Sequence, residues 1–215
     1  MPVDSVPPHL LDRARGLAAR GGRRILGIAG APGAGKSTLA GHLVEALNAG
    51  NPAVPLAVLV PMDGFHLAGR ELARLGRAGR KGAPDTFDAA GYAALLARLR
   101  TPEEDTTVYA PDFDRTLEEP VAGSLPVPPG VPLVVTEGNY LLHDGGHWAR
   151  VRPLLDEVWY LEADPEVRVR RLVDRHVRFG KERRDAELWV GDSDESNARL
   201  VARGRARADL VITAG

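Results

Sequence analysis

Short apolar runs and amphipathic stretches alternate along the whole chain, and this alternation predicts a sheet with helices between its strands. The apolar runs have the length of buried parallel strands and cover residues 25–29, 56–61, 133–136, 157–161 and 209–213. Stretches with helical spacing of apolar positions cover residues 7–20, 37–47, 89–99 and 195–205. We therefore predict one α/β domain over residues 1–215, with a mostly parallel central sheet and helices on both faces.

Other segments depart from this alternation. Residues 70–88 are polar and punctuated by glycine, and residues 106–110 have the pattern of a short strand. Residues 121–132 are rich in proline and glycine, which predicts a surface connection. A helix begins at Asp164, because an N-cap residue is followed there by Pro165 and by an acid in the first turn.

The helix after Asp164 carries four arginines at spacings of three, four and three, and these positions share one stripe: Arg168, Arg171, Arg175 and Arg178. Such a stripe either closes over a triphosphate or forms a solvated basic face. Gly180 gives a plausible hinge beyond it. We expect residues 164–192 to form a helical lid.

The segment between the first strand and the next helix fits the pattern G-x-x-x-x-G-K-[ST]. In this strand–loop–helix context, backbone N–H groups surround phosphate, the lysine reaches the outer phosphates and the serine hydroxyl ligates Mg²⁺. A fortuitous glycine-rich turn is the alternative, and the flanking elements disfavour it. We assign a nucleoside triphosphate, with Mg²⁺ at Ser37, to Gly30, Ala31, Pro32, Gly33, Ala34, Gly35, Lys36, Ser37 and Thr38.

Two acids directly follow apolar strands, Asp63 after residues 56–61 and Glu137 after residues 133–136. Ligands of open parallel sheets bind beyond the carboxyl ends of the strands, where the glycine-rich loop also lies. Phosphoryl transfer to a hydroxyl needs Mg²⁺ and a carboxylate that accepts the hydroxyl proton, and two acids suffice for both tasks. A single acid at such a position otherwise caps a helix or a turn.

Polar and aromatic residues near these acids predict a pocket for a small polar acceptor. They follow Asp63 directly and recur in residues 80–88 and 109–115, although each segment alone is typical of a surface loop. The candidate acceptor-binding residues are Asp63, Phe65, His66, Lys81, Asp85, Phe87, Tyr109, Asp112 and Arg115.

Composition limits the partners of this protein. The formal net charge of -1 gives no basic field for nucleic acid, and no apolar run has the length of a membrane-spanning helix. The chain has no cysteine, which excludes disulfides and thiolate metal sites and is typical of a reducing compartment. We expect a cytoplasmic protein that acts on a small hydroxylated molecule without a nucleic-acid or membrane partner, as a monomer or a homodimer.

Four segments resemble the phosphoribulokinase, uridine kinase and bacterial pantothenate kinase family, with the nearest match in its nucleoside/nucleotide kinase-like or fructose-transport-system kinase-like subgroup. They are the glycine-rich loop, Met62-Asp63-Gly64-Phe65-His66, residues 81–88 and Glu137-Gly138-Asn139-Tyr140. The resemblance extends over residues 24–212. It implies a P-loop NTPase fold and ATP-dependent phosphorylation of a hydroxyl group on a small metabolite.

The resemblance also implies roles for single residues. Asp63 would be the general base, Glu137 would lie near the metal, and Asn197 would lie near the adenine. Lys36 and Ser37 would act on phosphate and Mg²⁺, and Arg171 and Arg175 would belong to the lid. Residues 111–115 lack the histidine that uridine kinases carry there, and the chain is shorter than pantothenate kinases, so neither uridine nor pantothenate is favoured.

Two other functional classes compete with a kinase. A GTPase would need a guanine-reading N-K-x-D segment, and the sequence has none. An ATP-binding sensor or adaptor of a sugar-transport system would keep the P-loop, and catalysis would be secondary to its role. We favour the kinase, and the acceptor stays open among sugars, pentose derivatives, nucleosides and vitamin precursors.

Overall fold

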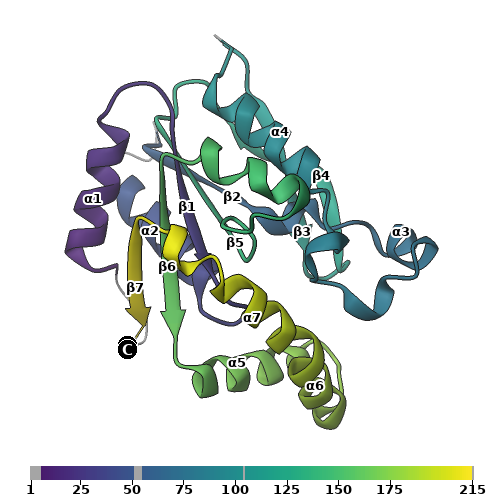
Figure 1. Cartoon of the computed structure of the whole chain (residues 1–215). Coiled ribbons are helices and arrows are strands. Elements are labelled where there is room, and N and C mark those ends of the chain that lie inside the picture. Colours follow the sequence, from purple (N-terminus) through teal and green to yellow (C-terminus); the bar gives the residue numbers. More distant parts are fainter. Residues whose placement is uncertain (1–5, 51–54, 104, 215) are drawn as a thin grey trace.

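The strands form a parallel sheet that places the glycine-rich loop at its centre (Figure 1). The computed structural model describes residues 6–50, 55–103 and 105–214. The sheet order is β2-β5-β1-β6-β7, and every pairing is parallel. The strands are β1 (Arg24–Gly30), β2 (Ala57–Pro61), β5 (Leu133–Gly138), β6 (Glu157–Ala163) and β7 (Leu210–Ala214). This arrangement confirms the predicted parallel α/β sheet.

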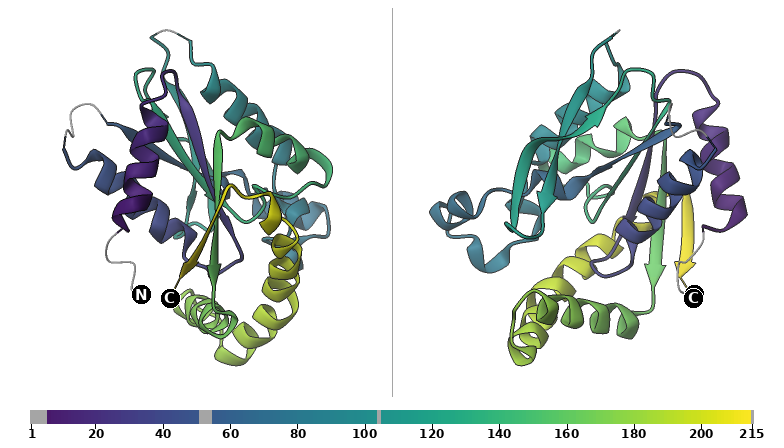
Figure 2. Two further views of the ribbon diagram at one scale, coloured as in Figure 1. Left: turned by 60° about the vertical axis from the view of Figure 1, so that its left-hand side comes forward. Right: turned by 180° about the vertical axis from the view of Figure 1, so that it is seen from behind.

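Helices cover both faces of the sheet, and two separate cores result (Figure 2). On one face α1 (Pro8–Ala18) and α2 (Lys36–Asn48) pack on Leu26 and Ile28 of β1. On the other face α4 (Ala89–Arg100) and α7 (Glu195–Ala202) pack on the side of Ile25 and Ala29, together with the short turns Gly146–Arg150 and Arg152–Leu154. The side chains of β1 thus alternate between the two cores, as the period of a strand requires.

The segment predicted as a surface connection contains a strand instead, and this prediction was wrong. β3 (Val108–Asp114) and β4 (Glu119–Val127) form an antiparallel hairpin beside the main sheet. Pro120 and Pro126 lie within β4 and hide its pattern, because proline occurs in strands only where an N–H is not needed. β4 lies at the edge of this hairpin and is mostly exposed, so no apolar alternation marks it in the sequence.

The polar segment after β2 folds into short helical pieces that surround the end of that strand. A 3-10 turn, Met62–Phe65, follows β2 directly and is followed by α3 (Gly69–Arg74) and the turns Ala78–Arg80 and Pro84–Thr86. An antiparallel bridge between His66 and Phe87 closes the segment into a loop. The loop thereby brings residues 81–87 back to the end of β2.

The lid segment is helical and has a small core of its own. α5 (Pro165–Arg178) begins as predicted, with the Asp164 carboxylate accepting hydrogen bonds from the N–H groups of Glu166 and Val167. α6 (Arg183–Trp189) and a π-helical turn, Val190–Asp194, lead on into α7. The apolar side chains inside this segment are those of Leu172, Val173, Ala186 and Val190. None of the helices described here has the length and apolarity needed to cross a membrane.

Candidate active site

The glycine-rich loop lies between β1 and α2, directly beneath α5. Gly33 has a φ of 77°, and a Cβ atom built there would lie 2.8 Å from the Leu172 Cγ and 2.9 Å from the Arg168 carbonyl oxygen. Glycine is therefore required at this position both by the backbone conformation and by the close approach of α5. The loop and the lid helix are in direct contact.

Lys36 is buried, and its ammonium group is held by two oxygen atoms. The Nζ donates to the Asn139 Oδ1 at 2.7 Å and to the Ala31 carbonyl oxygen at 3.1 Å. Burial lowers the pKa of Lys36, and the carboxylates of Glu137 and Asp63 act against this shift. The ammonium group thus lies among acceptors inside the loop, where an added phosphate would meet it.

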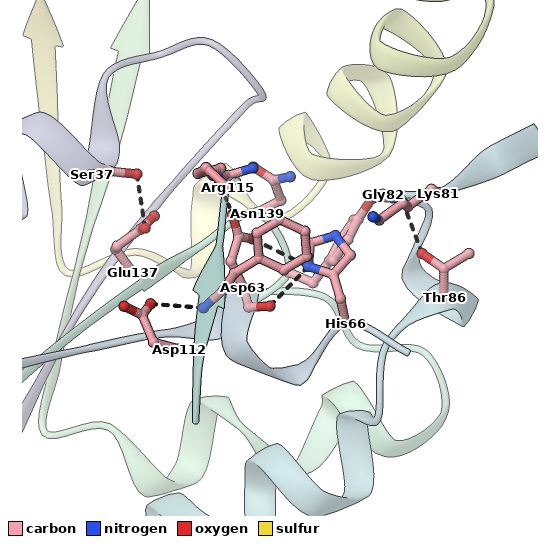
Figure 3. Close-up of polar contacts among 12 residues, drawn as sticks. Ser37, Asp63, His66, Lys81, Gly82, Thr86, Asp112, Arg115, Glu137 and Asn139 are labelled. Carbon is pink, nitrogen blue, oxygen red and sulfur yellow. Dashed lines mark hydrogen bonds and ion pairs between the residues drawn. The ribbon is translucent and has the colours of Figure 1, made fainter. Parts of the chain in front are cut away.

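Glu137 and Ser37 meet at the carboxyl end of β5 (Figure 3). The Ser37 hydroxyl donates to the Glu137 Oε1 at 2.8 Å. Burial raises the pKa of Glu137, as does the charge of Asp63, while Lys36 and the Ser37 hydrogen bond lower it. Two adjacent oxygen ligands fit Mg²⁺, which takes one or two protein ligands and completes its octahedron with phosphate oxygens and water. Among the described residues no three His or acidic side chains form a metal site by themselves.

Asp63 follows β2 at the same edge of the sheet, and it binds Arg115 from the β3–β4 turn. The Arg115 Nη2 donates to the Asp63 Oδ2 at 2.6 Å, and the His66 Nδ1 lies 3.9 Å from the Asp63 Oδ1. Burial raises the pKa of Asp63, but His66, Arg115 and Lys36 lower it more, and the net shift is downward. The carboxylate is therefore ionised over a wide pH range.

A cavity of about 650 Å³ connects these groups and brings together most of the residues predicted from the sequence. Its volume is within the range of small-molecule sites. Residues from the predicted phosphate-binding, acceptor-binding and lid sets all contribute to its lining. These are Pro32, Gly33, Gly35, Lys36, Ser37, Thr38, Asp63, His66, Lys81, Phe87, Arg115, Glu137, Arg171, Arg175 and Asn197.

Four candidate acceptor residues do not line this cavity. Phe65 packs on Tyr92 with ring centroids 5.2 Å apart, and Asp85 forms ion pairs with the guanidinium groups of Arg77 and Arg80. Tyr109 is 59% exposed, and the Asp112 carboxylate accepts a hydrogen bond from the N–H of Phe113.

A β-bulge in β3 explains which of its side chains point inward. The register of the hairpin shifts between Ala110 and Asp112, so the side-chain alternation reverses there. Before the bulge Val108 and Ala110 are buried, and after it Phe113 points inward. A simple period of two would have placed Tyr109 and Phe113 on one face.

Three residues of the glycine-rich loop, Gly30, Ala31 and Ala34, support it without lining the cavity. Ala34 is buried in the core that holds α2, and the Ala31 carbonyl oxygen accepts the Lys36 hydrogen bond described above. Gly30 lies against β6, where an added Cβ would be 2.5 Å from the Leu161 carbonyl oxygen.

Comparison with known proteins decides the family. Residues 25–214 match the model of the phosphoribulokinase / uridine kinase family. The chain belongs to this family. The resemblance that its motifs carry is thereby confirmed.

Several relatives resemble this kinase over most of its length. "Putative uridine kinase C227.14" of Schizosaccharomyces pombe is 33% identical over 210 residues, which are 95% of this chain and 88% of that protein. The "uncharacterized protein YggC" of Escherichia coli is 33% identical over 190 residues, which are 88% of this chain and 77% of that protein. The crystal structure of a "putative fructose transport system kinase" from Silicibacter sp. TM1040 has a TM-score of 0.82 at 36% identity and covers 94% of this chain and 98% of its own.

The structural likeness extends to more distant P-loop proteins. YFH7 from Saccharomyces cerevisiae has a TM-score of 0.82 at 19% identity, over 98% of this chain and 100% of that chain, so it shares the fold. The protein is thus a P-loop kinase, a phosphotransferase of this family, with the predicted mostly parallel sheet. That ATP binds at the glycine-rich loop stays a prediction.

The four arginines of the stripe lie in different surroundings. Arg171 and Arg175 line the cavity from α5. Arg168 is buried instead, where it donates to the Pro32 carbonyl oxygen at 3.1 Å and pairs with Glu195 at the start of α7. Arg178 lies at the end of α5 and is exposed. The sequence predicted a common stripe, but it does not show that the first arginine lies against the P-loop.

The structure adds residues that the sequence analysis did not select. Asn139 binds Lys36. Its position in the sequence indicates a place in the site, because it lies two residues after Glu137 at the end of the same strand. Trp189, to which no chemistry was assigned, lines the cavity, with the Lys181 Nζ 4.6 Å from its ring centroid. Phe113 and Glu118 line the cavity from the hairpin, which pattern alone did not place there.

Asn197 lines the cavity and contacts the loop after β2. Its Nδ2 donates to the Gly82 carbonyl oxygen at 3.4 Å, so the side chain faces the loop that carries Lys81. The same Gly82 oxygen accepts a hydrogen bond from the Tyr140 hydroxyl at 2.5 Å. A contact between Asn197 and adenine stays a prediction.

Proposed function

We propose that this protein is a Mg²⁺-dependent kinase that transfers the γ-phosphoryl group of ATP to a hydroxyl group of a small metabolite. One observation carries the proposal. The ionised carboxylate of Asp63 lines the same cavity as Lys36, Ser37 and Glu137 of the phosphate end. A kinase needs this combination of a phosphate site and an ionised carboxylate that open on one cavity.

The residues at the phosphate end fit the triphosphate and its metal. Ser37 and Glu137 would hold Mg²⁺, which supplies charge neutralisation at the phosphate oxygens. The Lys36 ammonium group exchanges its present acceptors for phosphate oxygens. Arg171 and Arg175 approach from the lid and stabilise the charge on the transferring group.

Asp63 acts on the acceptor. Its carboxylate accepts a hydrogen bond from the acceptor hydroxyl and takes the proton as the hydroxyl oxygen bonds to the γ-phosphorus. The bond between that phosphorus and the bridging oxygen breaks, and ADP leaves with the electron pair. Asp63 then returns the proton to solvent.

The names of the relatives do not select one acceptor, since uridine kinase, pantothenate kinase and fructose transport system kinase occur among them. We therefore propose a hydroxylated metabolite of the sugar or nucleoside kind, or a related compound. A sensor or adaptor linked to sugar transport is the alternative, and it requires no acceptor-dependent turnover.

The Asp63→Asn variant tests the base. We expect kcat for acceptor-dependent ADP release to fall by about 10²–10⁴-fold, the usual contribution of a general base. The affinity for ATP, measured by calorimetry with a non-hydrolysable analogue, stays close to that of the wild type. Asp12→Asn, which removes an exposed carboxylate on α1, is the matched control and keeps full turnover. Undiminished kcat in Asp63→Asn would contradict the proposed role.

A further inference from the structure

Two cationic side chains, Lys81 and Arg115, lie at the acceptor end of the cavity. The Lys81 Nζ lies 4.9 Å and the Arg115 Cζ 4.8 Å from the ring centroid of Phe113. The ring of His66 lies 4.9 Å from the same ring. Two full positive charges are thus gathered around one aromatic side chain that lines the cavity.

These cations are separate from those at the phosphate end. Figure 3 shows Ser37 and Glu137 on one side of Asp63 and Lys81 on the other. The phosphate end already has Lys36, and the lid adds two arginines. Lys81 and Arg115 come from other elements, the loop after β2 and the β3–β4 turn, so ATP does not account for them.

The present partners of the two cations leave them available to a ligand. The Lys81 Nζ donates to the carbonyl oxygen of Glu118 at 2.7 Å. It also lies 3.6 Å from the Oε2 of Glu118, whose side chain is about half exposed. Arg115 is bound to Asp63 and is 46% exposed in its side chain. In each pair one partner is about half exposed to solvent, so an anion that enters the cavity can compete for the cation.

The pair of Arg115 and Asp63 has a chemical consequence. Asp63 must accept a hydrogen bond from the acceptor hydroxyl, yet one of its oxygens already binds the guanidinium. A second anion in the cavity would take over the guanidinium and free that oxygen. Guanidinium binds carboxylate and phosphate groups with two parallel hydrogen bonds, so either group can replace Asp63.

We propose that the acceptor of this kinase carries an anionic group, a carboxylate or a phosphate, that binds Lys81 and Arg115 while its hydroxyl lies at Asp63. The inference rests on the proposed function. Because Arg115 lies within 2.6 Å of Asp63, the anionic group and the reacting hydroxyl are separated by only a few bonds. The ring of Phe113 forms an apolar wall beside them.

Binding of matched acidic and neutral probes to the protein tests the proposal. The full chain, saturated with Mg²⁺ and a non-hydrolysable ATP analogue, is titrated calorimetrically with D-glycerate and glycerol 3-phosphate, and with glycerol as their neutral counterpart. Ribose 5-phosphate and ribose form a second pair. The two acid types distinguish a carboxylate from a phosphate acceptor.

The wild type is compared with Lys81→Gln, Arg115→Gln and the double variant, with Arg98→Gln as a control that removes an exposed arginine on α4, outside the cavity. We expect at least one acid to bind about tenfold or more tightly than its neutral counterpart, and the double variant to lose this preference. The Lys81→Arg variant retains most of it, and Arg98→Gln retains all of it. Equal binding of acid and neutral probes, no binding of either, or an unchanged preference in the double variant overturns the inference.

Turnover separates this inference from the proposed function. Phosphorylation of glycerol or ribose at the rate of their acidic counterparts would uphold the kinase and overturn the anionic acceptor. Selective binding of an acid without any ADP release, by a protein that binds the ATP analogue, would uphold the anion site and contradict the proposed function.

Discussion

The side chain of Asp63 binds a cation in the free protein and must bind a proton during the proposed phosphoryl transfer. Arg115, His66 and Lys36 lower the pKa of its carboxyl, and burial alone would raise it. A carboxylate stabilised in this way is ionised and can accept a proton, but it is also a weak base. Release of Arg115 by the acceptor would strengthen the base at the moment when it is needed.

The Arg115→Gln variant tests this link between charge and proton affinity. Removal of the guanidinium removes an influence that lowers the pKa of Asp63, so the pKa rises. The kcat/KM of the acceptor depends on ionised Asp63 in the free enzyme, and its acid limb therefore moves to higher pH.

The measurement is the pH profile of kcat/KM in wild type and variant, with circular dichroism at each pH as a control for folding. Arg98→Gln serves again as the matched loss of one charge. An acid limb that stays in place in the folded Arg115→Gln protein would show that the guanidinium does not set the pKa of Asp63.

Among the elements, α5 and the glycine-rich loop act as one unit. The backbone of α5 at Arg168 and the side chain of Leu172 leave no room for a Cβ at Gly33. Arg168 adds a hydrogen bond to the Pro32 carbonyl oxygen from the same helix. A movement of α5 is therefore transmitted directly to the phosphate-binding backbone.

The Gly33→Ala variant breaks this fit. The new methyl group would displace α5, and the left-handed φ adds strain of about 1–3 kcal/mol. We expect affinity for a non-hydrolysable ATP analogue to fall about tenfold or more, as measured by calorimetry. Gly41→Ala is the matched control, since Gly41 lies inside α2 with no atom within 4 Å of its added methyl group.

Gly41→Ala leaves ATP binding unchanged and raises the free energy of unfolding by about 0.5–1 kcal/mol, because alanine is the better helix former. Wild-type affinity in Gly33→Ala would mean that α5 does not constrain the loop.

The hairpin shows which elements the sequence could not reveal. β1, β5 and β6 are apolar runs buried on both faces, and the edge strands β2 and β7 are apolar runs that are partly buried, so hydrophobicity alone located all five. β4 is exposed and carries proline, and the bulge in β3 reverses its alternation. Long-range packing, and not local pattern, decides that Arg115 meets Asp63 and that Tyr109 faces solvent.

For the whole molecule, stability is unevenly distributed. The two large cores lie against the sheet, whereas α5 and α6 enclose a separate small cluster. Segments with few buried apolar contacts open more readily than the core of a protein. The lid segment is therefore expected to unfold locally before the sheet does.

Amide hydrogen exchange checks this expectation. Amides of α5 and α6 exchange faster than those of α2 and α4 in the free protein. A non-hydrolysable ATP analogue with Mg²⁺ slows the lid amides, because the phosphates bind Arg171 and Arg175 on α5. Equal protection of α5 and α4 without ligand would contradict an independent lid.

Much of the site also followed from the order of the strands. The carboxyl ends of β1, β2 and β5 meet at one edge, so the sequence alone predicts that Lys36, Asp63 and Glu137 lie together. This prediction does not extend to side chains that arrive from outside the sheet. Asn197 and Trp189 come from helices whose positions depend on tertiary packing, and their contacts required the structure.

The position of β1 in the sheet has a consequence for how the chain is made. β1 leaves the ribosome early, but its two neighbours, β5 and β6, are encoded far downstream, with Arg24 paired to Leu133 and Leu26 to Glu157. Parallel pairing over such separations forms slowly, because a long loop must close first. During translation the apolar strand that ends in the glycine-rich loop therefore waits unpaired, and a nascent chain of this kinase exposes it to aggregation and to chaperones until β6 has emerged.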